Sequence, residues 1–297
     1  MRNELRLVEP ADERPYLTWL YAPGDRPQVV AKALAAGADV VIVDLEDAVA
    51  PDRKQYAREA TVELLTEPRP ASSRIHVRIN ALGGPLARQD VEALVTLPGL
   101  AGLRLPKVEH RRDVLNVAEW AAEARLKARV FGMVPLYALI ESALGVENAY
   151  KIACAHSAVR GIALGEADLS ADLGTSATSG LAWPRSRTIV AARAALLPPP
   201  AQSVYADVRD TAGLAESCAE GRTLGFLGRA AIHPRQLEAI RCAYLPTSQE
   251  IDSAREITEA AQADSGALAL PDGRFVDAAV VAGARRTLLL AEWAAEF

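Results

Sequence analysis

The sequence predicts an α/β protein built on a closed (β/α)8 TIM barrel with a C-terminal helical lid. Short β-branched runs alternate with longer amphipathic stretches along residues 17–235, which is the pattern of repeated βα units. That span is close to the roughly 250 residues typical of this barrel. The first strand–helix turn, residues 23–27 (PGDRP), lacks the GxGxxG pattern of a dinucleotide-binding sheet, so the barrel is favoured over a doubly wound fold.

The predicted strands are apolar runs with many β-branched residues. The clearest is residues 40–46 (VVIVDLE), which is almost wholly apolar, as expected of a parallel strand covered on both faces. The strand predicted at residues 202–205 is short. In chain order, the predicted strands are residues 17–23, 40–46, 74–80, 102–107, 130–139, 161–164, 202–205 and 225–232. Predicted helices lie between them at residues 26–36, 52–65, 90–96, 111–126, 146–156 and 212–222, with one more after Trp183.

The pattern changes after Pro234. Helices are predicted near residues 236–244, 248–263 and 276–295, and a loop rich in Gly, Ala and Pro separates the last two. This segment is too small to have a core of its own. We therefore predict a barrel over residues 1–235 and a lid or oligomerisation segment over residues 236–297, packed on the barrel or on a neighbouring subunit.

Composition excludes several classes of function. The net charge of −5 and pI near 5.6 argue against a nucleic-acid partner, which would require a clustered basic face. No apolar run approaches the roughly 20 residues of a membrane span, and residues 1–15 have charges of both signs and no apolar core. The three cysteines are far apart and fit no metal or redox spacing. These features predict a cytoplasmic protein with no membrane partner.

Polar side chains follow the predicted strands, at the end where (β/α)8 enzymes carry their chemistry. Each one taken alone is explained as a solvated loop residue or an ion-pair partner. Together they predict one rim that binds a substrate. The residues are Asp44, Glu46 and Asp47 after the second strand, Arg78 after the third, Lys107 after the fourth, Glu141 after the fifth and Asp168 after the sixth.

Glu141 and Asp168 are the candidate metal ligands. Each follows an apolar strand, where an unpaired carboxylate is costly to bury. Two carboxylates without a neighbouring His or Cys favour Mg²⁺, or Mn²⁺ as the alternative, over zinc. Arg78 is suited to bind a substrate carboxylate or to stabilise an enolate, and an ion pair with Asp44 or Glu46 is a compatible alternative. No Ser–His–Asp order or GxSxG motif supports acyl-hydrolase chemistry.

With these residues assembled, the sequence resembles the HpcH/HpaI aldolase and citrate lyase beta-subunit family. The resemblance runs over nearly the whole chain, and its specificity comes from many short motifs in the right order. The matching segments are residues 21–27 (YAPGDRP), 44–49 (DLEDAV), 77–80 (VRIN), 105–109 (LPKVE), 139–142 (LIES), 165–169 (GEADL), 225–229 (GFLGR) and 232–234 (IHP).

The resemblance implies a Mg²⁺ ion held by Glu141 and Asp168, with Arg78 on the keto or carboxylate end of the substrate. Residues 273–277 (GRFVD) stand where the branch of the family that uses acyl-CoA has a catalytic aspartate, often supplied by the lid of a neighbouring subunit, with Phe275 in place of a methionine. By itself, Asp277 would be interpreted as a helix N-cap. The resemblance makes it the expected acid or base, with Arg78 as the second catalytic residue.

Three departures from the family pattern concern the substrate end of the site. Leu17 stands where the family usually has arginine, Arg229 where it has lysine, and residues 201–203 (AQS) where many members have Ala-Ile-Asp. The lysine-to-arginine exchange keeps the charge but changes its geometry. These changes affect the thioester contacts more than the metal ligands.

The expected activity is Mg²⁺-dependent carbon–carbon cleavage or condensation of a β-hydroxyacyl-CoA such as malyl- or citramalyl-CoA, giving an α-keto acid and an acyl-CoA. Asp44, Glu46 and Lys107 are expected to bind substrate with Arg78, in a homotrimer or hexamer. One alternative is a free hydroxy-acid aldolase, or a citrate lyase beta-like subunit acting on an acyl-carrier thioester. Another is a non-catalytic scaffold barrel.

Overall fold

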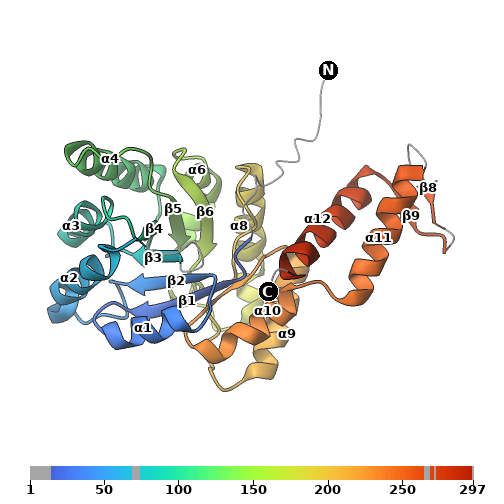
Figure 1. Ribbon diagram of the computed structural model, residues 1–297, viewed down its shortest axis with the longest axis horizontal. Coiled ribbons are helices and arrows are strands. Elements are labelled where there is room, and N and C mark those ends of the chain that lie inside the picture. Colours follow the sequence, from blue (N-terminus) through green and yellow to red (C-terminus); the bar gives the residue numbers. More distant parts are fainter. Residues whose placement is uncertain (1–14, 69–73, 264–267, 271, 296–297) are drawn as a thin grey trace.

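A curled sheet of parallel strands lies at the centre of the molecule, with helices along its outer face (Figure 1). This computed structural model describes residues 15–68, 74–263, 268–270 and 272–295. The sheet order is β6-β5-β4-β3-β2-β1-β7, so the first six strands are neighbours in chain order. The strands are β1 (Thr18–Pro23), β2 (Val40–Asp44), β3 (Arg74–Arg78), β4 (Leu100–Leu105), β5 (Leu136–Ile140), β6 (Val159–Leu164) and β7 (Arg229–Ala231).

The predicted closed eight-stranded barrel is correct only in part, because the described sheet has seven strands and stays open. The segment predicted as the seventh strand contributes one isolated parallel bridge, from Gln202 to Arg229. Residues 198–200 are three prolines, which have no amide hydrogen to donate to a ladder. Among the described residues, the β6 side reaches this segment through a side-chain bond, in which the Glu166 amide donates to the Ser203 hydroxyl at 3.2 Å.

Helices and sheet enclose the main core. Strand β2 is buried along its whole length, and α4 turns Val114, Val117 and Ala121 toward the sheet. Proline at the start of α1 and of α3 fits the first turn of a helix, where no amide donor is needed. The helices are α1 (Pro27–Ala35), α2 (Lys54–Leu65), α3 (Pro85–Leu94), α4 (Arg111–Lys127), α5 (Ala143–Glu147), α6 (Ala149–Ala153), α7 (Glu166–Leu173), α8 (Ala182–Ala194), α9 (Thr211–Leu224) and α10 (Leu237–Tyr244).

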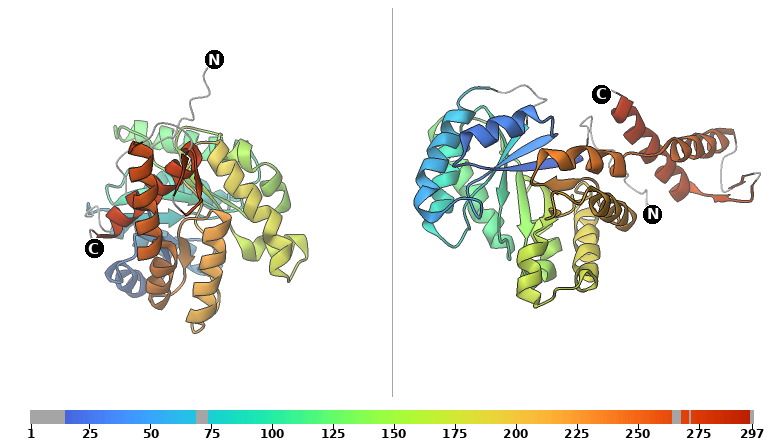
Figure 2. Two further views of the ribbon diagram at one scale, coloured as in Figure 1. Left: turned by 90° about the vertical axis from the view of Figure 1, so that its right-hand side faces the viewer. Right: turned by 90° about the horizontal axis from the view of Figure 1, so that it is seen from below.

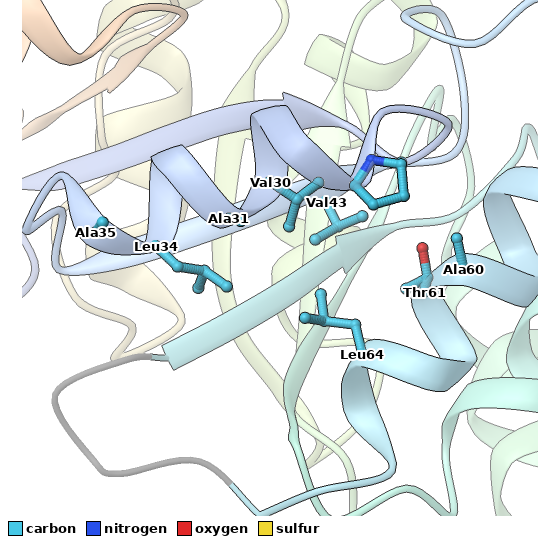
Figure 3. Close-up of a pocket in the computed structure, with 10 residues that line it drawn as sticks. Val30, Ala31, Leu34, Ala35, Val43, Ala60, Thr61 and Leu64 are labelled. Atoms are coloured by element: carbon cyan, nitrogen blue, oxygen red, sulfur yellow. The ribbon is translucent and has the colours of Figure 1, made fainter.

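A groove of about 390 Å³ lies on the outer surface between α1 and α2 (Figure 3). Val30, Leu34, Val43 and Leu64 make its wall largely apolar. None of the described residues that line it carries a titratable side chain, so it offers no acid–base or metal chemistry. The candidate site must therefore be sought elsewhere.

The C-terminal part forms an arm that extends away from the sheet (Figures 1 and 2). Its helices α11 (Ser248–Ala263) and α12 (Ala278–Ala295) pack on each other, and the short antiparallel strands β8 (Leu268–Ala269) and β9 (Phe275–Val276) pair between them. Phe275 is 64% exposed, and most of the described side chains of α12 are only partly buried. The arm therefore leaves apolar surface uncovered within one chain. No helix of the described residues is long and apolar enough to cross a membrane.

Candidate active site

The carboxyl ends of β2 to β6 bring the residues predicted from the sequence to one rim. Asp44 and Arg78 end neighbouring strands and lie opposite each other in register. Lys107 follows β4 by two residues, and Glu141 comes directly after β5. Asp168 lies in the first turn of α7, immediately after β6. Parallel strands thus place five side chains that are far apart in the sequence on one edge of the sheet.

Arg78 is fixed by three carboxylates. Its guanidinium donates to Asp44 from Nε at 2.8 Å and from Nη2 at 2.6 Å, which is the bidentate geometry of a strong ion pair. Nη1 lies 3.1 Å from Glu46 and 3.4 Å from Asp47. Burial opposes its charge, but the bond to Asp44 and the acidic neighbours raise the pKa of Arg78, so it stays cationic. Arg78 therefore forms ion pairs with its acidic neighbours, and these ion pairs fix the orientation of its side chain.

Lys107 contacts residues that follow β2 as well as residues that follow β5 and β6. Its ammonium lies 3.0 Å from Glu46, 3.4 Å from Asp47 and 4.0 Å from Asp168. Its backbone has a φ of 52°, in the left-handed region that a residue with a Cβ adopts only at some cost. In this conformation the Lys107 amide donates to Glu141 Oε2 at 2.9 Å. One strained residue thus places a cation beside β2 and an amide donor beside β5.

The loop after β2 is held from outside by Lys54. Its ammonium donates to the carbonyl oxygens of Leu45 at 2.8 Å and Glu46 at 2.6 Å. Glu46 is itself buried, and burial raises the pKa of its carboxyl, while Arg78 and Lys107 lower it. The loop that carries the acidic residues is therefore fixed on both of its sides.

Glu141 and Asp168 line one cavity of about 590 Å³ at the rim. Glu141 is buried, and desolvation raises its pKa to about 7, with further raising by the charges of Glu46 and Asp168. It packs against Gly165, where a Cβ would clash with the Glu141 carboxylate. The Asp168 side chain is about half exposed. The two predicted metal ligands therefore face a shared space, one of them buried and the other open to solvent.

This donor set fits Mg²⁺. The two carboxylates supply hard oxygens, and the charge of Asp168 helps to raise the pKa of Glu141, so negative charge is left for a cation to neutralise. Among the described residues, no three His, Cys, Asp or Glu side chains form a metal-binding group. Glu141 and Asp168 would thus be the whole protein contribution, and Mg²⁺ commonly completes its octahedron with water and substrate oxygens.

The remainder of the cavity is lined by acidic, other polar and apolar residues. Glu109 accepts a hydrogen bond from the Ser142 hydroxyl at 2.7 Å, and Asp172 accepts one from the Ala143 amide at 2.7 Å. The other lining residues are Ala81, Leu82, Gly83, Lys107, His110, Asp113, Asn116 and Trp120. A substrate beside the two carboxylates would thus contact both charged and apolar groups.

Asp277 lies apart from this rim within one chain. It stands between β9 and α12, and its carboxylate accepts the amides of Ala279 and Val280, each at 2.9 Å, as a helix N-cap. It is not among the residues that line the cavity, and Figure 1 shows the β8–β9 end of the arm away from β2 to β6. A catalytic role for Asp277 remains a prediction, and it would require the arm of another copy.

Two groups on the concave face of the sheet, Tyr21 and Arg104, were not predicted from the sequence. Tyr21 lies beneath Arg78, whose Cζ is 5.2 Å from the centre of the ring. Arg104 lies opposite Arg78 in the β3–β4 register and is buried. The available signal was a charged residue between Leu103 and Leu105, inside an otherwise apolar strand.

A curled parallel sheet with acidic residues and an arginine at its carboxyl rim is the arrangement of an α/β enzyme. The model of the HpcH/HpaI aldolase/citrate lyase family matches residues 17–234, and the chain belongs to this family of carbon–carbon lyases. A citrate lyase subunit beta from Leuconostoc mesenteroides subsp. cremoris is 36% identical over 288 residues, covering 94% of each chain. A (3S)-malyl-CoA thioesterase from Cereibacter sphaeroides is 36% identical over 294 residues, covering 95% of this chain and 97% of that protein.

A solved structure extends the similarity to three dimensions. The protein CitE from Mycobacterium tuberculosis, in complex with magnesium, acetoacetate and coenzyme A, is 34% identical with a TM-score of 0.78. The match covers 93% of this chain and 98% of that one. The family predicted from the residues is therefore confirmed, and the similarity includes the fold of this chain.

Proposed function

We propose that the chain is a Mg²⁺-dependent carbon–carbon lyase that cleaves a β-hydroxyacyl-CoA, such as malyl- or citramalyl-CoA, into an α-keto acid and an acyl-CoA. The observation that carries this proposal is the shared cavity of Glu141 and Asp168, with Arg78 held on the same rim. The CitE complex holds magnesium, a keto acid and coenzyme A together, which supports the same class of substrate.

Mg²⁺ held by Glu141 and Asp168 would act as a Lewis acid on the hydroxyl and carboxylate oxygens of the substrate. Arg78 binds the carboxylate end, because its planar guanidinium offers donors in a fixed fork. Asp44 and Glu46 contribute by holding that fork, and Lys107 adds a second positive charge. The site is thus arranged before the substrate arrives, which is how developing charge is stabilised without reorganisation.

Cleavage requires two proton movements. Loss of the hydroxyl proton lets the adjacent C–C bond break, so that the keto acid leaves and the bonding electrons pass to an enolate of the acyl thioester. The enolate carbon then takes a proton, and we assign this proton to Asp277 from the arm of a neighbouring subunit. This assignment rests on the family resemblance of residues 273–277 and on the position of the arm, which extends away from its own rim.

Assembly follows from the same arm. Residues 236–297 would act as lid and oligomerisation segment, and the uncovered apolar surface of α12 and Phe275 would be buried against another copy in a homotrimer or hexamer. The three cysteines are free, which fits the reducing cytoplasm in which we place the protein.

The test is a substrate panel with purified protein and Mg²⁺. Malyl-CoA, citramalyl-CoA, the free hydroxy acids and an acyl-carrier thioester are each supplied, and the keto acid, acyl thioester and free thiol are measured separately. The proposal requires equal amounts of keto acid and acyl-CoA from a CoA substrate. Release of the intact hydroxy acid with free CoA would instead show thioester hydrolysis, and turnover of only a free acid or only a carrier thioester would favour those alternatives. If the protein shows neither metal-dependent turnover nor Mg²⁺ binding, a non-catalytic scaffold is favoured.

A further inference from the structure

Arg104 is a buried cation without a counter-charge in the described part of the chain. It is 4% exposed, and no carboxylate of the described residues forms an ion pair with it. Its Nε has no hydrogen-bond partner. Desolvation lowers the pKa of Arg104, and the nearby charge of Arg78 lowers it further. A charge buried in this way is costly, so its presence requires a reason other than stability.

Aromatic rings surround this guanidinium. Arg104 Cζ lies 4.3 Å from the ring centre of Trp19 and 5.5 Å from that of Tyr137. Trp19 also contacts His76 edge to face, with ring centres 5.5 Å apart. Burial together with the charge of Arg104 lowers the pKa of His76 well below its usual range, so that ring stays neutral. The aromatic faces offset part of the lost hydration of Arg104 but supply no negative charge.

Tyr21 connects Arg104 to the rim. Arg104 and Tyr21 interact electrostatically through their side chains, and arginine has only donors, so the phenol oxygen is the acceptor open to Arg104 while the phenol proton is left for another partner. Burial raises the pKa of Tyr21, so the phenol keeps this proton at neutral pH. The charged groups of the rim that act on the hydroxyl are Arg78, Asp44 and Glu141. Tyr21 therefore interacts with both the unpaired cation and the charged groups of the rim.

We propose that Arg104 is a positioning residue of the lyase reaction, which orients the Tyr21 hydroxyl toward the substrate and supplies uncompensated positive charge beneath it. This inference rests on the proposed function. Arg78 is neutralised by three carboxylates, so it adds little net positive potential to the rim. Of these two described arginines, Arg104 is the one whose charge is left over. In a buried environment, such fixed charge and a pre-oriented donor favour the negative charge that develops on substrate oxygens.

The test uses R104M, R104K and Y21F, with R160M as a matched control, because Arg160 is an exposed arginine in β6. Met fills the space without a charge, so we expect R104M to keep or raise the Tm while lowering kcat about tenfold or more, with a smaller change in KM. We expect R104K to recover part of that loss. Y21F should lower kcat to a similar extent, and R104M/Y21F should be no worse than the poorer single variant, because the two residues act as a unit.

A second readout does not depend on turnover. Calorimetry measures the affinity for oxalate, a small planar dianion, in the presence of Mg²⁺, and we expect R104M to weaken it severalfold while Mg²⁺ binding alone is unchanged. An R104M variant with lower Tm but normal kcat and oxalate affinity would show that Arg104 is only structural. Equal impairment of R104K and R104M would exclude a role for the charge. If the wild-type protein cleaves no substrate, the proposed function fails, while the oxalate measurement still decides on Arg104.

Discussion

The two sides of the rim differ in how their charges are balanced. On the side of β2 to β4, the carboxylates of Asp44, Glu46 and Asp47 face the cations of Arg78 and Lys107 at 2.6 to 3.4 Å. On the side of β5 and β6, Glu141 and Asp168 have one backbone amide and one ammonium at 4.0 Å. The first side is a frame of ion pairs, in which each carboxylate has a cation within 3.4 Å, and the second side has negative charge without a cation that close.

This difference separates positioning from binding. The frame fixes the direction of Arg78 before any ligand arrives, since its Nε and Nη2 already donate to Asp44. On the other side, desolvation together with the charges of Glu46 and Asp168 raises the pKa of Glu141 to about 7, so a nearby cation would stabilise its ionised form. We therefore assign orientation of the substrate to one side and metal binding to the other.

The largest expected effect comes from removing the unbalanced charge. E141Q and D168N keep the shape of each side chain but remove a negative ligand, so Mg²⁺ affinity should fall by more than about 100-fold, since even outer-shell partners of a metal typically cost 10–100-fold. Lyase activity should fall with it. Isothermal titration with Mg²⁺ measures the first effect, and E123Q, at an exposed glutamate of α4, is the control. Normal Mg²⁺ affinity in both variants would refute the metal assignment.

The residue expected to protonate the enolate carbon is Asp277 of the arm, because the carboxyls of the frame and of the metal pair already have other roles within the described rim. D277N should lower kcat by about 10²–10⁴, the usual contribution of a general acid, and should leave Mg²⁺ affinity unchanged. Mixing D277N with E141Q after dissociation and reassembly should restore part of the activity, because some sites then combine an intact rim with an intact arm. A mixture that stays inactive, although the subunits have exchanged, would contradict catalysis across subunits.

Disturbing the frame of ion pairs around Arg78 should have the next largest effect. R78K keeps one charge but loses the bidentate fork, so kcat/KM should fall by about 10²–10³, as when one oriented donor of a transition state is removed. R78M should also lower the free energy of unfolding by about 3–5 kcal/mol, because Asp44 and Glu46 lose their main buried partner. Urea unfolding and steady-state kinetics measure the two effects, with exposed R160M as control. If R78K binds Mg²⁺ normally but retains full kcat/KM, Arg78 serves only the frame.

The sequence allowed the frame and the pair to be located for a physical reason. Strands β2 to β6 each end at, or within two residues of, a charged residue, and parallel strands in chain order must bring these ends to one edge. Barrel closure could not be judged in the same way. A ladder depends on backbone partners from two distant segments, and the prolines at 198–200 leave Gln202 with a single bridge.

Arg104 shows a second limit of the pattern. A charged residue inside a strand is normally assigned to solvent, and alternation alone gives the same side for Arg104 as for Gly102. Its meaning depends on Trp19, Tyr21 and Tyr137, which come from other strands and meet it only in the folded sheet. Pairwise register was needed to identify it.

The smallest expected effect is on pH dependence, and it compares the two sides directly. In the metal-free protein the Glu141 pKa is about 7, above the ordinary value of 4.5 that the unfolded chain should show. The protonated form is thus favoured by folding, and this contribution to stability is present below pH 4.5 and is lost as the pH rises through about 7. In EDTA, the Tm of the wild type relative to that of E141Q should therefore decrease as the pH rises from 4.5 to about 7. Mg²⁺ must displace the proton, so its affinity should be about tenfold weaker at pH 6 than at pH 8, with proton release visible by calorimetry in two buffers. E123Q should keep this dependence, whereas a pH-independent Mg²⁺ affinity in the wild type would mean that Glu141 is already ionised and that its charge is balanced after all.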